Sequence, residues 1–305
     1  MGYVIATDRN FTEKGYLTAN PDVAAAVKAG AFQSGLAHFR SHGRKERRRL
    51  IAKEQATVAA IYEAMRRTPM HLWVGGGDPE ITGLDCYEAL QHLAPIMQGQ
   101  RVLDYGCGIG RTAVHVASCV PDVTLVGVDI VPSMIEFCQT HIAKVLANTT
   151  FYCIEDENPH YDRFLPSEPF GRVSLETFVA EHRGSFDLVY AYSVFTHFDP
   201  SMTERYLQTL GLLLSSSGKI MLTCFLNAPS NPATKRLPLG SHFLDSEPND
   251  PLRFAVYDLG YLTDLMYANG LRLTSAMFGH WRGYGQAGAS CHYQDALVLE
   301  KLAAN

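Results

Sequence analysis

The chain of 305 residues lacks the features that mark several large protein classes. Its N-terminus has no basic segment followed by an apolar core, so we expect no secretory signal. No apolar run is long enough to cross a bilayer. The net charge of −5 provides no broadly basic surface for coating nucleic acid. These absences predict a soluble, cytoplasmic protein that binds neither a membrane nor nucleic acid.

Cysteine is sparse and scattered. The seven cysteines form no CxxC pair and no other metal-ligand spacing. An odd number without a secretory signal suits a reducing compartment, so no disulfide framework is expected. His280 and His292 flank one turn, but no carboxylate or cysteine evidently completes a site with them. We therefore predict that the protein holds no metal.

The chain divides by its pattern into two parts. Residues 22–29 and 34–42 read as short helices that end at glycines. Helices of this length need a packing partner. A longer helix is predicted over 50–67, where a Thr-Pro pair ends it. The pattern predicts a small helical unit over 1–67 and a second domain over 68–305.

The second domain alternates strands with helices. An alternation of this kind predicts an α/β fold, in which a mostly parallel sheet carries helices on both faces. The predicted strands are 101–105, 123–129, 150–154, 186–192, 219–225, 271–278 and 294–301.

A glycine-rich turn follows the first of these strands. Glycines there allow a sharp reversal into a helix and the close approach of a ligand to the backbone. A turn of this kind is also found in NAD(P)-dependent oxidoreductases, and that class of enzyme stays open as an alternative. However, the G-x-G-x-x-G pattern of those enzymes requires glycine where Arg111 stands. Asp129, at the end of the second strand, suits the ribose of any cofactor that contains adenosine, so it does not decide between cofactor classes. A non-catalytic α/β scaffold with tight glycine turns also stays open.

With these residues in place, the chain resembles the class I S-adenosylmethionine-dependent methyltransferases over roughly 72–301. Three motifs stand in the order of that family. They are Asp104 with Gly106, Gly108 and Gly110; Asp129 in Val128-Asp129-Ile130; and the strand and turn over 186–198. The resemblance implies a seven-stranded sheet that ends in an antiparallel hairpin, with S-adenosylmethionine as the cofactor.

The resemblance also implies residue roles. Asp104 would fix the turn and the amino group of the cofactor, Asp129 would hold the ribose hydroxyls, and Ile130 would pack on the adenine. Arg111 would reach a carboxylate or simply face solvent. The residue that meets the adenine amine is open between Glu155 and Asp156. The predicted cofactor-binding set is Trp73, Asp104, Gly106, Cys107, Gly108, Gly110, Arg111, Asp129, Ile130, Tyr192 and Ser193.

His197 is the candidate catalytic base. Methyl transfer is an in-line displacement that mainly needs alignment, and a base is needed only when the acceptor must lose a proton. His197 follows a strand at the edge where ligands bind in open α/β sheets, and it titrates near neutral pH. A packing or capping role for this histidine is the alternative.

Aromatic residues and histidines near the last two strands suggest an acceptor site. The predicted substrate residues are His280, Trp281, Tyr284, His292 and Tyr293. Their pattern resembles one in bacterial methyltransferases of glycan or secondary metabolism, although Trp281 and Tyr293 could instead pack the end of the sheet. Residues 73–78 are predicted to form a lid, and the proline-containing segment 226–255 to cover the acceptor.

Residues 16–24, 34–39 and 42–43 also resemble small modules on bacterial glycan-pathway enzymes, which favours a sugar-linked acceptor. Together with the methyltransferase resemblance, the sequence predicts O- or N-methylation of a small molecule or a glycan. Whether the protein acts as a monomer or a homodimer stays open.

Overall fold

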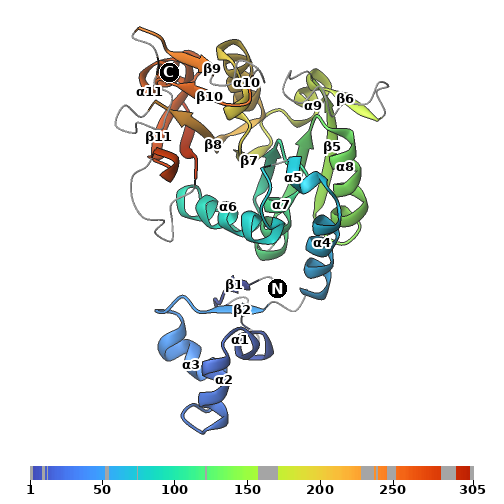
Figure 1. The fold of residues 1–305 in the computed structure, drawn as a ribbon, viewed down its shortest axis with the longest axis vertical. Helices are drawn as coiled ribbons and strands as arrows, with labels where there is room; N and C mark the ends of the chain where they lie inside the picture. Colours follow the sequence, from blue (N-terminus) through green and yellow to red (C-terminus); the bar gives the residue numbers. More distant parts are fainter. Residues whose placement is uncertain are drawn as a thin grey trace. The chain divides into compact units, whose positions relative to one another are not determined.

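The computed structural model describes residues 3–8, 11, 13–51, 55–73, 75–120, 122–156, 171–227, 237, 240–245, 252–282 and 293–302. The chain forms two compact units, Met1–Pro69 and Met70–Asn305 (Figure 1). No helix in the described ranges is both long enough and apolar enough to cross a membrane.

The first unit packs short helices beside a two-stranded sheet. Tyr16 and Phe39 are fully buried at its centre, and the Tyr16 hydroxyl lies 2.9 Å from Nδ1 of His38. The Glu13 carboxylate accepts the backbone N–H of Gly35 at 2.6 Å, which ties the first helix to the third. The elements are β1 (Tyr3–Ile5), α1 (Glu13–Ala19), α2 (Pro21–Lys28), α3 (Gly35–His38), a π-helix (Phe39–Gly43), β2 (Arg49–Ile51) and α4 (Gln55–Arg67).

The prediction of a wholly helical N-terminal unit is wrong at its strands. Residues 50 and 51 were expected to begin a long helix, but they belong to β2, which pairs antiparallel with β1, and α4 starts at Gln55. The pairing buries Leu50 completely in the core of the unit. This contact is distant in sequence, and it outweighs the local helical period. The rest of the predicted apolar face is buried in α4, through Val58, Tyr62 and Met65.

The second unit is built on one large sheet. Its longest path runs in the order β11-β12-β8-β7-β3-β4-β5-β6, and β9 and β10 extend it beside β8. The pairs from β8 through β6 are parallel, whereas β12 pairs antiparallel with both β8 and β11. The strands are β3 (Arg101–Tyr105), β4 (Thr124–Asp129), β5 (Thr149–Glu155), β6 (Arg172–Ser174), β7 (Phe186–Ala191), β8 (Leu214–Leu226), β9 (Phe243–Asp245), β10 (Ala255–Tyr257), β11 (Leu271–Met277) and β12 (Asp295–Lys301).

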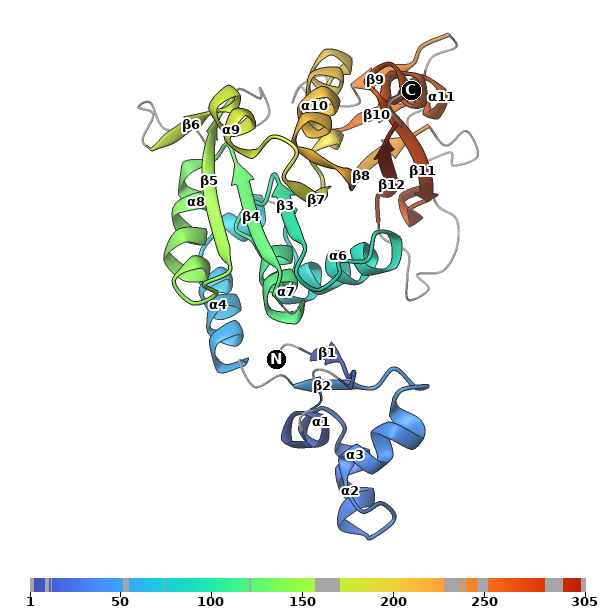
Figure 2. The ribbon, with the colours of Figure 1, turned by 180° about the vertical axis from the view of Figure 1, so that it is seen from behind.

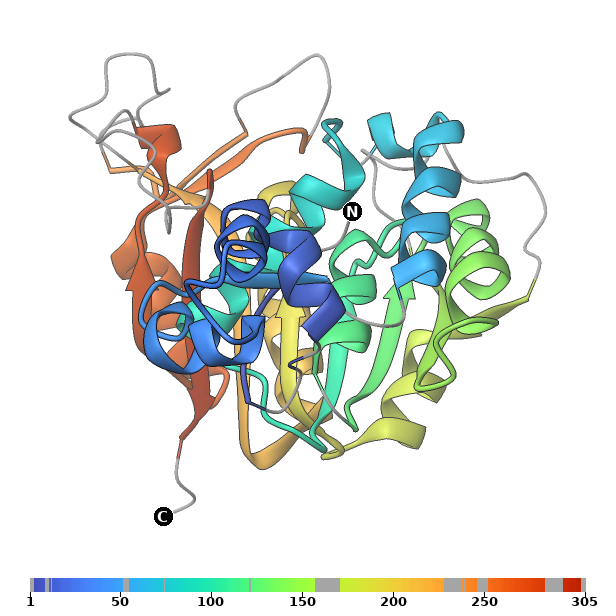
Figure 3. The same ribbon diagram turned by 90° about the horizontal axis from the view of Figure 1, so that it is seen from below.

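The predicted α/β class is confirmed, including the seven central strands and the terminal antiparallel hairpin. Helices flank the sheet on both faces (Figures 2 and 3). They are α5 (Met70–Trp73), α6 (Pro79–Leu93), α7 (Arg111–Cys119), α8 (Pro132–Cys138), α9 (Leu175–His182), α10 (Pro200–Leu213) and α11 (Leu259–Ala268). The short strands β6, β9 and β10 and the helix α9 lie in segments that sequence reasoning left irregular.

The side chains of β3 alternate between the two faces of the sheet, which differ in their surroundings. Leu103 and Tyr105 join the apolar cluster that includes residues of α9, α10 and α11. Because successive side chains of a strand point to opposite faces, Asp104 lies on the other face of the sheet. A carboxylate is thereby buried, with 4% of its surface exposed, at the end of a central strand.

The helices α6 and α7 pack on each other at Gly83. A Cβ atom at this position would lie 2.4 Å from the carbonyl oxygen of Arg111, the first residue of α7. The His115 imidazole of α7 also lies 3.1 Å from the Glu80 carbonyl of α6. The close approach of α6 therefore helps to position the start of α7.

We expect Gly83→Ala to destabilise the second unit by about 1–3 kcal/mol, since overpacking against a backbone atom forces the helices apart. The matched control is Gly211→Ala in α10, where the nearest contact of the new Cβ is 3.9 Å away. Without a clash, alanine stabilises a helix by up to about 1 kcal/mol over glycine. Chemical denaturation of the two variants measures both effects, and equal stabilities would contradict the argument.

Candidate active site

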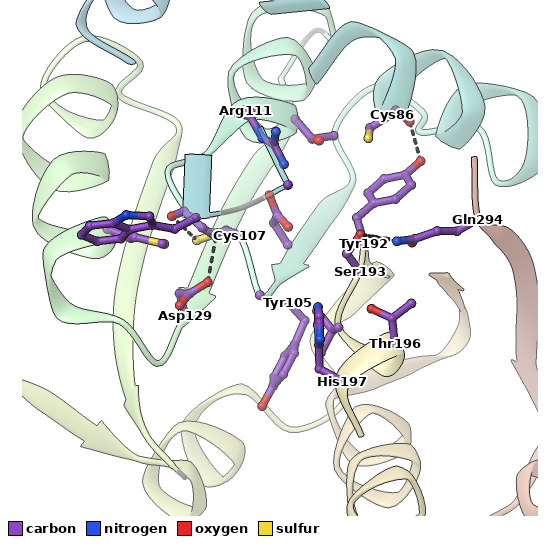
Figure 4. Close-up of a pocket in the computed structure, with 18 of the residues that line it drawn as sticks. Cys86, Tyr105, Cys107, Arg111, Asp129, Tyr192, Ser193, Thr196, His197 and Gln294 are labelled. Atoms are coloured by element: carbon purple, nitrogen blue, oxygen red, sulfur yellow. Dashed lines mark hydrogen bonds between the residues drawn. The ribbon is translucent and has the colours of Figure 1, made fainter. Parts of the chain in front are cut away.

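A cavity of about 910 Å³ opens at the carboxyl ends of the central strands. Residues from the ends of β3, β4, β7 and β8 line it, together with segments beside β10 and β12 (Figure 4). This is the edge at which ligands bind in open α/β sheets. Of the predicted residues, those that line the cavity are Trp73, Asp104, Gly106, Cys107, Gly108, Arg111, Asp129, Ile130, Tyr192, Ser193, His197 and Tyr293.

The glycine turn adopts the backbone that its sequence requires. Gly106, Gly108 and Gly110 all have positive φ, at 76°, 55° and 79°. A Cβ at Gly106 would lie 2.4 Å from a methyl group of Val194, so this position has no room for a side chain. Gly110 lies outside the cavity lining, and a Cβ there would lie 2.4 Å from Ile142 in the π-helix Gln139–Ala143. Gly110 therefore supports the conformation of the turn through packing on the side away from the cavity.

Asp129 joins this turn to the next helix. Its Oδ2 accepts the backbone N–H of Gly108 at 2.8 Å, and its Oδ1 accepts the N–H of Val131 at 2.9 Å. Burial raises the pKa of this carboxyl, and the backbone donors oppose that shift. Each carboxylate oxygen has a second lone pair, so Asp129 can also accept hydroxyl groups from the cavity.

Asp104 is a buried acid that faces the same cavity. Burial raises the pKa of its carboxyl to about 8, and the Asp129 carboxylate acts in the same direction. The Tyr190 hydroxyl and Arg111 oppose the shift. A buried carboxyl of this kind is stabilised in its charged form by a neighbouring cation, as an ammonium group would provide.

Arg111 connects the cavity to the loop that precedes α6. Its guanidinium donates to the Gly76 carbonyl at 3.1 Å, and Gly75, Gly76 and Gly77 line the cavity with Trp73. The side chain is half-buried, so the structure favours a role in the cavity over the solvent-facing alternative. Val74 lies outside the described residues.

The turn after β7 is held by a polar network. Ser193, at a positive φ of 56°, donates its backbone N–H to the Thr223 hydroxyl at 2.8 Å. The Thr223 hydroxyl donates to Oε1 of Gln294 at 2.6 Å, and Nε2 of Gln294 donates to the Ser193 hydroxyl at 2.8 Å. The Tyr192 hydroxyl donates to the Cys86 carbonyl of α6. Three distant segments thus fix the floor between β3 and β8 (Figure 4).

His197 has a defined orientation at the wall of the cavity. Its Nδ1 lies 2.9 Å from the carbonyl oxygen of Leu252. A carbonyl can only accept, so Nδ1 carries the hydrogen, and the neutral ring then has its lone pair at Nε2. This tautomer is the one that a base needs, provided that Nε2 meets the acceptor.

The predicted acceptor cluster is only partly at the cavity. Tyr293 lines it, whereas His280 and Trp281 do not. Trp281 donates its indole N–H to the fully buried Asp295 at 2.7 Å, and its ring packs on Phe225. This placement favours the packing interpretation for Trp281. Tyr284 and His292 lie outside the described residues.

Other lining residues lie outside the predicted site set, among them Thr196, Phe225, Arg253, Phe254 and Gln294. Thr196 belongs to the predicted turn within 186–198, Arg253 and Phe254 belong to the predicted cover, and Gln294 directly follows the predicted substrate residue Tyr293. Glu155 and Asp156, the two candidates for the adenine amine, are not part of the lining, and Asp156 pairs with Arg205 at 3.0 Å.

The residues at β3 and β4 fit S-adenosylmethionine. The cofactor has an ammonium group and a ribose diol, and the cavity offers a buried acid of raised pKa at Asp104 and open lone pairs at Asp129. The bare backbone of Gly106 and Gly108 leaves room for a ligand beside the turn. Among the described residues, no cluster of three histidine, cysteine or acidic side chains could hold a metal ion.

Comparisons with known proteins agree with this site. The model of the methyltransferase domain family matches residues 82–304. Phosphoethanolamine N-methyltransferase 3 of Arabidopsis thaliana is 24% identical over 164 residues, which are 52% of this chain and 28% of that protein. A ubiquinone biosynthesis O-methyltransferase of Albidiferax ferrireducens is 24% identical over 204 residues, covering 64% of this chain and 71% of that protein.

Solved structures share the fold. The PH0226 protein of Pyrococcus horikoshii has a TM-score of 0.50 at 17% identity, over 78% of this chain and 98% of that chain. The chain spans just over a quarter of the Arabidopsis relative, at 28% of its length.

The chain therefore has a Rossmann-like fold, with S-adenosylmethionine as its cofactor. It belongs to the methyltransferase domain family. Membership in this family argues against the alternative prediction of an NAD(P)-dependent oxidoreductase, which the glycine turn alone does not exclude.

We expect Asp129→Ala to raise the Kd for S-adenosylmethionine roughly tenfold to hundredfold, since hydrogen bonds to a charged group contribute about 1.5–3 kcal/mol. The substitution also releases the N–H groups of Gly108 and Val131. Isothermal titration measures the change. Asp264→Ala, at an exposed position of α11, is the control and should bind as the unmodified protein does. Equal affinity in both variants would remove Asp129 from the site.

Asp104→Asn should separate stability from cofactor binding. The folded protein keeps a proton on Asp104 up to about pH 8, whereas an unfolded chain loses it near pH 4. The folded state binds the extra proton between these values, so stability falls as the pH rises through that window. The amide cannot ionise, and we expect the variant to gain on the order of 2–5 kcal/mol relative to the unmodified protein at pH 9.

The same variant should bind S-adenosylmethionine more weakly, because it cannot provide the carboxylate for the ammonium group. Denaturation at pH 5 and pH 9, with titration of the cofactor, measures both effects. A stability difference that is the same at the two pH values would contradict the raised pKa.

Proposed function

We propose that this protein methylates a hydroxyl group of a small molecule or a glycan, with S-adenosylmethionine as the donor and His197 as the general base. The observation that carries the proposal is the contact of His197 Nδ1 with the Leu252 carbonyl, which places the hydrogen of the neutral ring on Nδ1 and its lone pair on Nε2 in a residue that lines the cavity. A hydroxyl is a poor nucleophile until it loses its proton, so this acceptor class requires such a base.

S-adenosylmethionine, when bound, supplies a methyl group that is already activated on a sulfonium. Asp104 and Asp129 bind and orient the donor at the ends of β3 and β4. Alignment of nucleophile and donor contributes roughly 7–11 kcal/mol to catalysis in well-oriented reactions. His197 would take the hydroxyl proton as the oxygen gains the methyl group, and the bond between the methyl group and sulfur would break, so that S-adenosylhomocysteine leaves. The network of Ser193, Thr223 and Gln294 holds the floor of the cavity in place.

N-methylation is the second candidate. The Arabidopsis relative is named as a phosphoethanolamine N-methyltransferase, and a neutral amine needs no base. The relative from Albidiferax is named as an O-methyltransferase. The orientation of His197 favours oxygen as the methylated atom. The resemblance of the N-terminal unit to modules on glycan-pathway enzymes supports including glycans among the acceptors.

We expect His197→Gln to lower kcat roughly 10²- to 10⁴-fold while the Kd for S-adenosylmethionine stays unchanged, because a positioned base contributes a factor of this size. A product-mass screen of hydroxyl- and amine-bearing acceptors identifies an active acceptor first. His141→Gln removes an exposed histidine outside the cavity and is the matched control.

The acid limb of the pH–rate profile should also disappear in His197→Gln and persist in the control. If turnover is equal in the two variants, His197 is not the base and N-methylation gains support. Cofactor binding without any methylated product would instead favour a non-catalytic scaffold.

A further inference from the structure

The two halves of the cavity differ in the charged residues that line them. The half at β3 and β4 contains Asp104, Asp129 and Arg111. The half beside β7, β8 and β10 contains no carboxylate among the described lining residues, and Arg253 is its permanent cation. The cofactor half therefore matches a ligand with an ammonium group, whereas the acceptor half carries the opposite sign.

Arg253 is held by its neighbours in a fixed place. The N–H of Leu252 donates to Oδ2 of Asp245 in β9 at 2.9 Å, and the Leu252 carbonyl accepts from His197. The chain then enters β10, where Val256 stands opposite Phe225 in the parallel ladder with β8. The guanidinium lies 5.6 Å from the centre of the Phe254 ring. The backbone contact that orients the base thus also positions the cation.

Arg253 is exposed and forms no ion pair with any of the other residues that the structure describes, whereas Arg48 and Arg272 do. Arginine presents a planar fork of donors that matches carboxylate and phosphate groups. Its position in the lining leaves this fork available to a ligand.

The Thr196 hydroxyl is a second polar group in this half that can form a hydrogen bond with a ligand. The Thr196 side chain lines the cavity and is 1% exposed, yet its hydroxyl has no hydrogen-bond partner among the residues that the structure describes. Leaving a buried hydroxyl unpaired costs free energy, about 1–3 kcal/mol, so such a group points to a ligand. Figure 4 shows Thr196 beside His197.

Aromatic rings complete the acceptor half. Phe225 lies at the centre of the group, with its ring centre 5.7 Å from that of Phe254 and 6.1 Å from that of Tyr293. All three residues line the cavity. Rings in this arrangement provide a wall for a flat or ring-shaped body.

We propose that the methyl acceptor carries an oxyanion, a carboxylate or a phosphate, that Arg253 binds with help from the Thr196 hydroxyl, while its ring-shaped body packs on Phe225, Phe254 and Tyr293. The inference rests on the proposed function, because it assigns this half of the cavity to the acceptor. It narrows the acceptor from any hydroxyl compound to an anionic one.

Binding of simple probes tests this assignment without turnover. The protein is first saturated with S-adenosylhomocysteine, which fills the cofactor half and covers Arg111. Phenyl phosphate and benzyl alcohol are then titrated by calorimetry, because both carry a phenyl ring and only one carries an oxyanion. We expect phenyl phosphate to bind at least tenfold more tightly, with an affinity that weakens as salt is added.

Arg253→Gln should weaken phenyl phosphate binding roughly tenfold to hundredfold, as expected for loss of a charge-assisted hydrogen bond, and leave benzyl alcohol unchanged. Arg253→Lys should restore part of the affinity. Arg272→Gln removes an arginine of β11 that pairs with Glu300 at 3.0 Å outside this cavity, and it should behave as the unmodified protein.

Thr196→Val should weaken phenyl phosphate binding about two- to tenfold and also raise the midpoint of thermal unfolding without ligand, because the unpaired hydroxyl is removed. A purely structural role for Thr196 would not move the two readouts in opposite directions.

Equal affinity for the two probes, or an Arg253→Gln variant that binds phenyl phosphate normally, would overturn the proposal. These outcomes are distinct from failure of the proposed function, which would appear as absent binding of S-adenosylhomocysteine or as normal turnover in His197→Gln.

Discussion

The active site depends on the carboxylate of Asp129. It accepts one N–H from the glycine turn after β3 and another from the segment that leads into α8. Two neighbouring strand ends are thereby fixed relative to each other before any ligand binds. The neighbouring acid Asp104 is buried at the end of β3, where burial raises its pKa against the opposing effects of the Tyr190 hydroxyl and Arg111. The cofactor half is thus organised around two acids that the fold holds in unfavourable surroundings.

The parts of the fold that follow local rules were predictable from the sequence. Apolar runs bounded by turns mark the central strands, and the glycines at 106, 108 and 110 are required by positive φ. The strand ends place Asp104 and Asp129 at one edge of the sheet, so the position of both residues in the cavity lining follows from the same pattern. These features depend on a few neighbouring residues, which is why one sequence is enough to find them.

The proposed acceptor half of the cavity was harder to predict because segments distant in sequence build it. Arg253 reaches the cavity only through the pairing of β10 with β8, and β10 is three residues long. Gln294 joins Ser193 across 101 positions of the chain. Trp281 has the composition of a pocket residue, but the fully buried Asp295 draws its indole into the packing at the sheet end. The strand β2 was missed for the same reason, because β1, its partner, is more than 40 residues away.

The Leu252 carbonyl has a further consequence, since one peptide unit joins the orientation of His197 to the chain that carries Arg253. A ligand that contacts Arg253 therefore stabilises the same backbone that holds the imidazole. Binding at Arg253 and alignment of the His197 ring are therefore thermodynamically linked. By reciprocity, the free energy by which a bound ligand favours the aligned ring equals the free energy by which an aligned ring favours binding of that ligand.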